Sequence, residues 1–204
     1  MKKIFTCICA ALLVGCSGGS DKITIAVYGD SITAAEPGLT KSFASELGVA
    51  LNANVKDYSR GGGSVRDYKE VDNSADLIII RYAGADALHY GSSTEAVNTF
   101  RTSLLALIST ANKPVVLTGT ITLAPYEQLL DYNYPFDAYT QKQKDLTVYH
   151  KEVQSIATSL GIPFVDIRKV PFYGREDLRD EIHPNQGYST RLSNYIISEI
   201  IYLI

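Results

Sequence analysis

The sequence predicts one α/β domain in which a central parallel sheet of about five strands is covered by helices on both faces. Apolar, strand-like runs alternate with segments that carry apolar residues at helical spacing, in the order βαβαβαβαβα. The strand-like runs are apolar at almost every position, which is typical of strands covered on both faces. The chain has 204 residues, of which 46% are hydrophobic and 20% charged, enough for one core of this kind.

Each expected element follows from its local pattern. The expected strands are residues 22–29, 53–59, 75–84, 113–123 and 162–167, and the run "ADLIIIRYAG" at 75–84 is the strongest buried-strand signal. The expected helices, marked by apolar residues three or four positions apart, are residues 43–51, 97–108, 146–160 and 192–203. No internal repeat and no domain linker interrupts this order.

Ligands of parallel α/β sheets bind beyond the carboxyl ends of the strands. Three loops are expected there: the loop after Tyr28, the glycine loop at 60–64 and the loop after Arg81. Residues 124–145 show little pattern, and a connection of that length inside a domain is usually functional. Its aromatic residues, which suit stacking on sugar rings, packing of an acyl chain or a plain surface loop, are Tyr126, Tyr132, Tyr134, Phe136 and Tyr139.

The N-terminus reads as a targeting segment. Lys2 and Lys3 precede a 12-residue apolar stretch, which is too short to span a bilayer as a stable helix. The stretch runs into "LVGC", which resembles a bacterial lipobox ending at Cys16; the alternatives are an ordinary secretory signal and an apolar core strand with a chance cysteine. The resemblance implies a signal peptide at 1–15, a lipidated Cys16 with a flexible tether at 16–22, and a domain at 23–204.

This interpretation predicts a lipid-anchored protein of the bacterial cell envelope, at the outer membrane or periplasmic face rather than in the cytoplasm. Ser17 after the lipidated cysteine favours the outer membrane under enteric-type sorting rules. Cys7 and Cys9 would leave with the signal peptide, so one mature chain could form neither a disulfide nor a cysteine-based metal site. The formal net charge of -3 provides no basic surface for nucleic acid.

Ser31 follows the first apolar run directly, in "YGDSIT". A serine hydroxyl is a poor nucleophile unless a base removes its proton, and the chain has three histidines that could do so. His150 falls inside an expected amphipathic helix, and His89 has no obvious acid to orient it. His183 follows Asp180 by three residues, so the carboxylate could accept from Nδ1 and leave Nε2 to take the proton of Ser31.

Four sequence blocks resemble those of the GDSL/SGNH hydrolase family, in the family's order: "YGDSIT", the glycine loop, the loop after "LIIIRY", and "DEIHP". The resemblance covers residues 23–204. It implies a flavodoxin-like three-layer α/β/α sandwich, and a serine esterase, lipase, thioesterase or carbohydrate O-deacetylase that needs no metal and no cofactor. It implies further that Ser31 is the nucleophile, His183 the general base and then acid, and Asp180 the residue that orients His183.

In this family two backbone N–H groups stabilise the oxyanion. The resemblance assigns them to Ser31 and Gly62, although Gly61 or Gly63 would fit in another register. Glycine suits this role because it lets the backbone approach the reacting carbonyl closely.

The third block departs from the family pattern Gly-x-Asn-Asp, whose asparagine is a further oxyanion donor. Alignment of "RYAGADAL" on its aspartate puts Ala83 at the glycine and Ala85 at the asparagine; alignment on Gly84 puts Asp86 at the asparagine instead. The first alignment is preferred, because it keeps the aspartate and the following small residue in place. Neither register supplies an amide.

Three functions remain at this point. The first is an active serine esterase acting on acylated envelope carbohydrate or lipid, with an oxyanion hole of two donors or with a replacement donor from elsewhere in the chain. The second is a weak or inactive lipid-anchored domain that binds glycans or acyl groups, which the missing amide at Ala85 would favour. The third is an unrelated flavodoxin-like binding module, disfavoured because "GDSITAAEPG" lacks the glycine pattern of a phosphate-binding loop.

Overall fold

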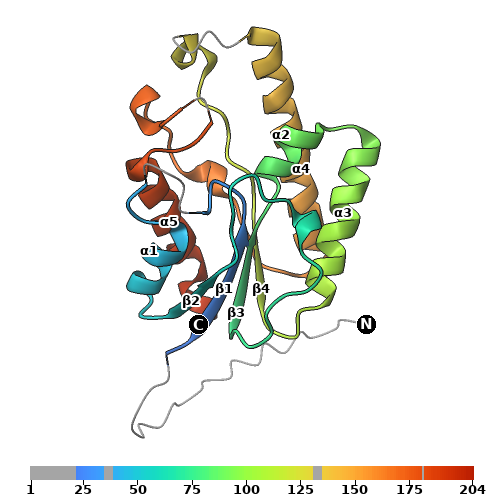
Figure 1. Cartoon of the computed structure of the whole chain (residues 1–204), viewed down its shortest axis with the longest axis vertical. Coiled ribbons are helices and arrows are strands. Elements are labelled where there is room, and N and C mark those ends of the chain that lie inside the picture. Colours follow the sequence, from blue (N-terminus) through green and yellow to red (C-terminus); the bar gives the residue numbers. More distant parts are fainter. Residues whose placement is uncertain (1–21, 35–38, 131–134, 181) are drawn as a thin grey trace, which may run out of the picture.

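Five parallel strands form the central sheet, in the order β2-β1-β3-β4-β5. The structure is a computed structural model, and it describes residues 22–34, 39–130, 135–180 and 182–204. Figure 1 shows the strands side by side with helices on either side of them. The predicted α/β fold with a parallel five-stranded sheet is confirmed. The strands are β1 (Thr24–Gly29), β2 (Asn54–Asp57), β3 (Leu77–Arg81), β4 (Val115–Thr118) and β5 (Phe164–Val165).

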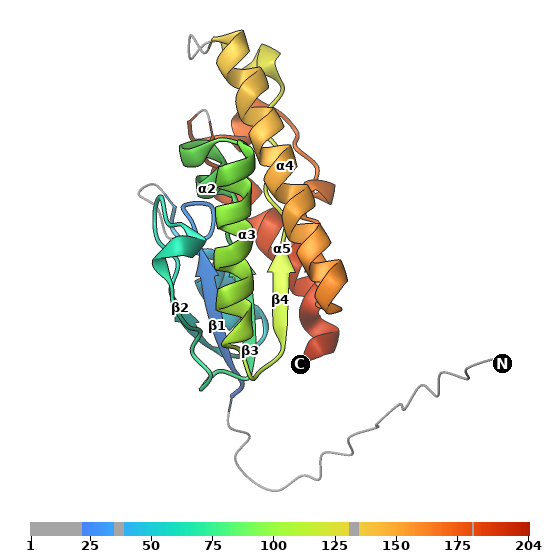
Figure 2. The same ribbon diagram turned by 90° about the vertical axis from the view of Figure 1, so that its right-hand side faces the viewer.

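Helices cover both faces of the sheet, which gives three layers (Figures 1 and 2). One face is covered by α1 (Phe43–Ala50) and α5 (Gln186–Ile200). The other is covered by α2 (Gly84–Tyr90), α3 (Thr94–Ser109) and α4 (Phe136–Leu160). The short 3₁₀ turns are η1 (Val65–Asp67), η2 (Tyr126–Gln128), η4 (Ile167–Lys169), η5 (Arg175–Asp177) and η6 (Ile201–Leu203).

Two apolar cores hold the layers together. Successive side chains of a strand point to opposite faces. Ile25 and Val27 of β1 therefore pack with α1 and α5, whereas Ala26 and Tyr28 pack with α3 and α4. This division explains why the sequence of β1 is apolar at almost every position.

The helix α4 begins at Phe136, ten residues before its predicted start, so the expected loop at 124–145 is wrong in its second half. The first turns of α4 are rich in polar residues and extend past the sheet, where no apolar stripe is needed (Figure 2). The segment before α4 contains η2, in which the Tyr126 ring packs against Phe136 and Tyr139 with centroid distances of 4.9 and 5.4 Å. Tyr132 and Tyr134 lie outside the described residues.

The predicted signal peptide, Cys16 and most of the tether also lie outside the described residues. Within the described ranges, no helix is both long enough and apolar enough to cross a membrane.

Candidate active site

The turn after β1 presents Ser31 at the carboxyl end of the sheet. The N–H groups of Thr33 and Ala34 both donate to the backbone oxygen of Asp30, each at 3.0 Å, and the Asp30 side chain accepts from Ile32 N at 3.1 Å. Gly29 is required before this turn, because a Cβ there would lie 2.2 Å from Oγ1 of Thr33. None of these hydrogen bonds within the turn involves the Ser31 hydroxyl, which is therefore free to contact a residue from another part of the chain.

The Ser31 hydroxyl meets the imidazole of His183, although 152 residues separate the two in the chain. Ser31 Oγ lies 3.0 Å from His183 Nε2, and His183 Nδ1 lies 2.8 Å from Oδ2 of Asp180. The loop that carries the pair is closed by a hydrogen bond from Arg179 N to His183 O at 2.9 Å and ends where Asn185 caps α5. The structure therefore brings together the three predicted catalytic residues in one hydrogen-bonded series.

Asp180 is held in its anionic form. Its Oδ1 accepts from the backbone N–H groups of His183 and Ile182, at 2.7 and 2.9 Å, besides the contact with the imidazole. Partial burial acts to raise the pKa of Asp180, but these N–H groups and His183 outweigh it, and the pKa lies below its usual value. A fixed carboxylate of this kind sets Nδ1–H as the tautomer and leaves Nε2 as the acceptor for the serine proton.

The glycine loop lies against the nucleophile turn. Arg60 N donates to Gly29 O at 3.1 Å, and Gly63 N donates to Arg60 O at 3.0 Å. Gly63 is buried with its N–H already engaged, whereas Gly61 and Gly62 line the same pocket as Ser31. Gly62 has φ +65°, a conformation that favours glycine. The alternative assignment of the oxyanion donor to Gly63 is thereby disfavoured.

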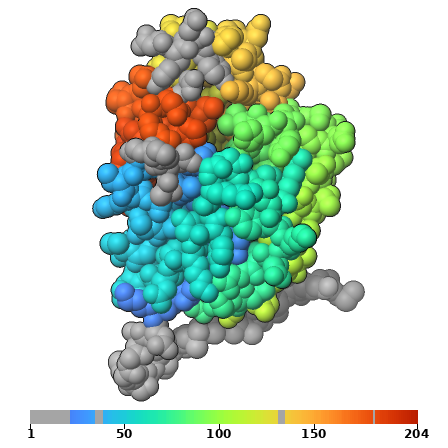
Figure 3. Space-filling model, in the orientation of Figure 1, coloured from blue at the N-terminus to red at the C-terminus, as the bar shows by residue number. Residues whose placement is uncertain are grey.

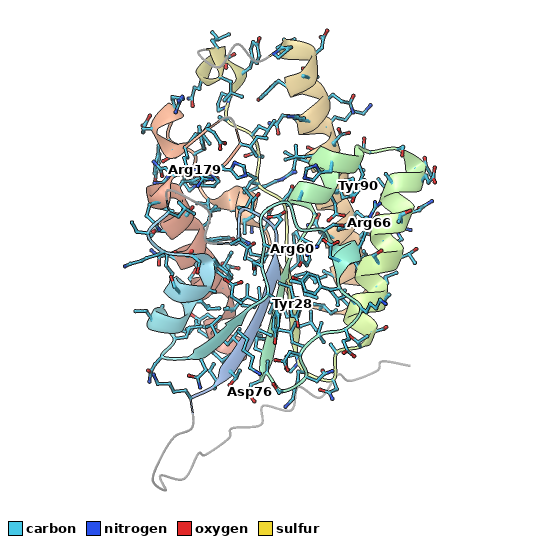
Figure 4. The ribbon with its side chains drawn as sticks, in the orientation of Figure 1. Tyr28, Arg60, Arg66, Asp76, Tyr90 and Arg179 are labelled. Carbon is cyan, nitrogen blue, oxygen red and sulfur yellow. The ribbon has the colours of Figure 1, made fainter. Side chains whose placement is uncertain are left out.

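These loops enclose an open pocket of about 490 Å³. Figure 4 shows Arg60 of the glycine loop, Tyr90 of α2 and Arg179 around the carboxyl end of the sheet, far from Asp76 at the other end. In Figure 3 the glycine loop, α2 and the segment around Arg179, coloured cyan, green and orange, lie on the same face of the molecule. The residues lining the pocket are Ser31, Gly61, Gly62, Ala85, Leu88, His89, Lys142, Ile182 and His183.

Residues 27–188 match the sequence model of the GDSL-like lipase/acylhydrolase family. The chain belongs to this family. The predicted family resemblance is confirmed, and the protein is an ester hydrolase as a class. No curated protein matches the sequence.

Solved structures of GDSL-like and related enzymes share the fold. A carbohydrate acetylesterase from Sinorhizobium meliloti is 13% identical with a TM-score of 0.67, covering 90% of this chain and 100% of that chain. A lipolytic G-D-S-L family member from Veillonella parvula is 17% identical with a TM-score of 0.68, and the match covers 89% of this chain and 100% of that chain. A salicylyl-acyltransferase from a tetracycline biosynthetic pathway is 20% identical with a TM-score of 0.65, and the match covers 91% of this chain and 56% of that chain.

The third block of the GDSL-like domain adopts the register in which Ala85 replaces the family asparagine. Ala83 has φ 116°, a conformation that suits the glycine expected there. Ala85 lines the pocket, whereas Asp86 is fully buried and accepts hydrogen bonds from Ser64 Oγ at 2.5 Å and Val65 N at 3.3 Å. The register that would put Asp86 at the oxyanion is therefore wrong.

Two buried charged residues that sequence reasoning missed, Asp30 and Arg81, lie in this region of the GDSL-like fold. Asp30 Oδ2 accepts from Ala85 N at 3.0 Å, which joins the nucleophile turn to the start of α2. Burial raises the pKa of Asp30, whereas hydrogen bonds from the backbone N–H groups of Ala85 and Ile32 and the charge of Arg81 act to lower it. Burial also lowers the pKa of Arg81 to about 10. The sequence did contain one indication of a buried charge here, because Arg81 is the single charged residue inside the apolar run "LIIIRYA".

The other two histidines have different surroundings. His150 is buried in α4, with Nε2 3.6 Å from Asp166 Oδ1, and acts as a packing residue away from Ser31. His89 lines the pocket, as does Lys142, which the sequence did not single out. Among the described residues, no group of three or more His, Cys, Asp or Glu side chains could hold a metal ion.

Proposed function

We propose that this protein hydrolyses carboxylic esters through Ser31, His183 and Asp180, by way of an acyl-enzyme. The observation that carries the proposal is the hydrogen-bonded series from Asp180 through His183 to the Ser31 hydroxyl, with distances of 2.8 and 3.0 Å, at the edge of an open pocket. A serine is activated in this way when its base is in turn oriented by an acid.

In the first half-reaction His183 Nε2 takes the proton of Ser31 while Oγ bonds to the ester carbonyl carbon. The carbonyl oxygen becomes an oxyanion, which the N–H groups of Ser31 and of Gly62 stabilise. The bond between the carbonyl carbon and the alcohol oxygen then breaks, and His183 gives its proton to the leaving alcohol. In the second half-reaction water replaces Ser31 in the same steps, which releases the carboxylic acid and restores the hydroxyl.

We place the substrate among acylated carbohydrates, with acylated lipid as the other candidate. The pocket is open and mixed in character, since Lys142 and His89 line it beside Leu88 and Ile182. Such a lining suits a polar alcohol component better than a long alkyl chain. One structure of similar fold is described as a carbohydrate acetylesterase, which supports the same class.

We further propose that the mature protein is attached to the cell envelope by lipidation of Cys16. The sequence "LVGC" after a 12-residue apolar stretch supports this anchor. An envelope location brings the enzyme to acylated polysaccharide and lipid rather than to cytoplasmic thioesters.

The deciding experiment compares the soluble domain with its Ser31→Ala variant on short chromogenic esters. Ser31→Ala should abolish turnover, down by about 10⁴-fold or more, with an unchanged thermal melt. A serine-directed phosphonate should label the wild type at Ser31 alone. Undiminished turnover in the variant, or labelling elsewhere, would refute the assignment. A wild type inert on every ester would favour a binding protein that lacks turnover.

The substrate class is tested by a panel of O-acetylated oligosaccharides and of fatty-acyl esters of graded chain length. We expect acetyl release from the sugars and falling kcat/KM as the acyl chain lengthens. Rising kcat/KM with chain length would favour the lipid.

A further inference from the structure

The helix α2 places His89 one turn after Ala85. The two residues are four positions apart on a helix that runs from Gly84 to Tyr90, so they share one face. Side chains of a helix point back toward its N-terminus, and a residue therefore covers the surface of the turn before it. The imidazole of His89 is in this way directed over the position where the family carries an asparagine.

The contacts of the pocket agree with this direction. His89 Nε2 lies 3.7 Å from the position that a Cβ atom on Gly62 would occupy. His89, Gly62, Ala85 and Ser31 all line the one pocket. The imidazole thus reaches the glycine whose N–H is assigned to the oxyanion, whereas the methyl group of Ala85 offers no donor.

The ring nitrogens of His89 are available for this task. Neither makes a hydrogen bond to any other residue in the described part of the chain, and the side chain is exposed at the pocket. A neutral imidazole with hydrogen on Nε2 and an imidazolium can both donate from that nitrogen. Among the described residues, His89 has no carboxylate partner comparable to Asp180, so it is suited to donate to a substrate rather than to act as the base.

From this geometry we infer that His89 donates a hydrogen bond from Nε2 to the ester carbonyl oxygen as it becomes an oxyanion, in place of the asparagine missing at position 85. The inference rests on the proposed Ser31 mechanism. The charge on the oxygen grows as Oγ bonds to the carbonyl carbon, so the hydrogen bond is stronger in the transition state than in the bound substrate. Its loss should lower kcat with little effect on KM.

The test measures kcat and KM on a chromogenic acetate ester for variants at positions 85 and 89. His89→Ala should lower kcat by about 10²-fold, the lower end of the range for one lost oxyanion donor, with KM changed by less than about threefold. His89→Gln keeps an N–H donor and should retain more than about a tenth of the kcat. Tyr90→Phe, the neighbouring exposed position outside the pocket, is the matched control and should behave as the wild type.

A substitution at position 85 that restores the lost kcat would distinguish a hydrogen-bond donor role of His89 from a merely structural role. Ala85→Asn puts back the side-chain amide that the family carries at this position. In the His89→Ala background the same change should raise kcat by about tenfold or more. If thermal melts show that His89→Ala is unstable, His89→Phe replaces it, since it keeps a ring and removes both donors.

Several results would overturn the inference. They are a His89→Ala enzyme with wild-type kcat, a loss confined to KM, and a kcat loss that Ala85→Asn does not relieve. A loss of kcat in Lys142→Met with none in His89→Ala would move the role to the lysine. Ser31→Ala is assayed alongside: an active Ser31→Ala enzyme refutes the proposed function, whereas an inactive one with a silent His89→Ala refutes only the role of His89.

Discussion

At the scale of single residues, Asp180 has two tasks that share the same oxygen atoms. Its Oδ1 accepts two backbone N–H groups and shapes the loop, while both oxygens lie within 3.0 Å of His183 Nδ1. The carboxylate thus fixes the loop that places the imidazole and also the tautomer that the imidazole adopts.

Asp180→Asn should therefore damage activity more than stability at neutral pH. An amide can donate to Nδ1 and so favour the tautomer with hydrogen on Nε2, which cannot accept the serine proton. We expect kcat to fall by up to about 10⁴-fold, measured on the same acetate ester. Asp166→Asn, beside the buried His150, is a control for loss of a carboxylate near a histidine outside the pocket. A loss of less than about tenfold would contradict the orienting role.

The pH dependence of stability gives a second measure of the same carboxylate. The pKa of Asp180 in the folded protein lies below the ordinary aspartate value of 3.8, because the N–H groups and the His183 imidazole outweigh its partial burial. A carboxyl whose pKa is lowered by folding stabilises the protein above its unfolded pKa, and this stabilisation is lost as the pH falls through the folded value. The difference in unfolding free energy between the wild type and Asp180→Asn should be full at pH 7 and should shrink on acidification below about pH 4.

At the scale of elements, the active site depends on how β1, β3 and α2 are joined beneath it. Asp30 follows β1, Arg81 ends β3, and Ala85 lies in the first turn of α2. Asp30 is 2% exposed and Arg81 5%, and the charge of each favours the ionised form of the other, against the effect of burial. Removal of one partner of such a pair costs far more than removal of both.

Asp30→Asn should lower the free energy of unfolding by about 3 kcal/mol, because it leaves Arg81 charged and uncompensated in the interior. The double variant Asp30→Asn with Arg81→Met removes the isolated charge and should be more stable than Asp30→Asn alone. Chemical denaturation of the three proteins measures both differences. A single variant within about 1 kcal/mol of the wild type would contradict the prediction, as would a double variant less stable than the single.

A comparison of the helices and strands with their predicted ranges shows which elements the sequence pattern can predict. The strands and α1, α3 and α5 follow from apolar periodicity, because each buries a face against the sheet. The helix α2 was missed because its seven residues begin with glycine and continue an apolar strand run. The first ten residues of α4 were missed because they extend past the sheet and carry no buried stripe.

Some contacts of the candidate site could be predicted from the sequence and others could not; the contacts of His183 with Asp180 and Ser31 were expected, and the structure shows both. Ser31, His183 and Asp180 stand in motifs that the family shares, and each could be named in advance. The burial of Arg81 and the approach of His89 to Gly62 depend on how separate elements pack, which no local pattern encodes. The sequence favoured the register with Ala85 at the asparagine, and the backbone agrees by placing Ala85 in the pocket and Asp86 in the interior.

At the scale of the whole molecule, the pocket lies at one end of the sheet, and the described chain starts and ends at the other. The described chain starts beside the amino-terminal ends of the strands, where Thr24 N is hydrogen-bonded to Asp76 Oδ2 at 2.8 Å. Figures 1 and 2 show the C-terminus at this same end, away from the carboxyl ends of the strands. The exposed apolar side chains there are Ile201, Tyr202, Leu203 and Ile204.

An anchor at Cys16 would therefore hold this end toward the membrane and present the pocket to the opposite side. A lipid-anchored protein partitions with membranes, and Cys16→Ser, which removes the only thiol left after cleavage, should move it to the soluble fraction of a bacterial host. The kcat on a water-soluble acetate ester should be unchanged within about twofold, because the described chain starts at the end of the sheet opposite to the pocket. Ser17→Ala, one position on, is the matched control and should remain in the membrane fraction. Mass spectrometry of the mature N-terminus checks the modification itself: an unacylated wild type, or a Cys16→Ser protein that stays with the membrane, would contradict the anchor while leaving the Ser31 mechanism standing.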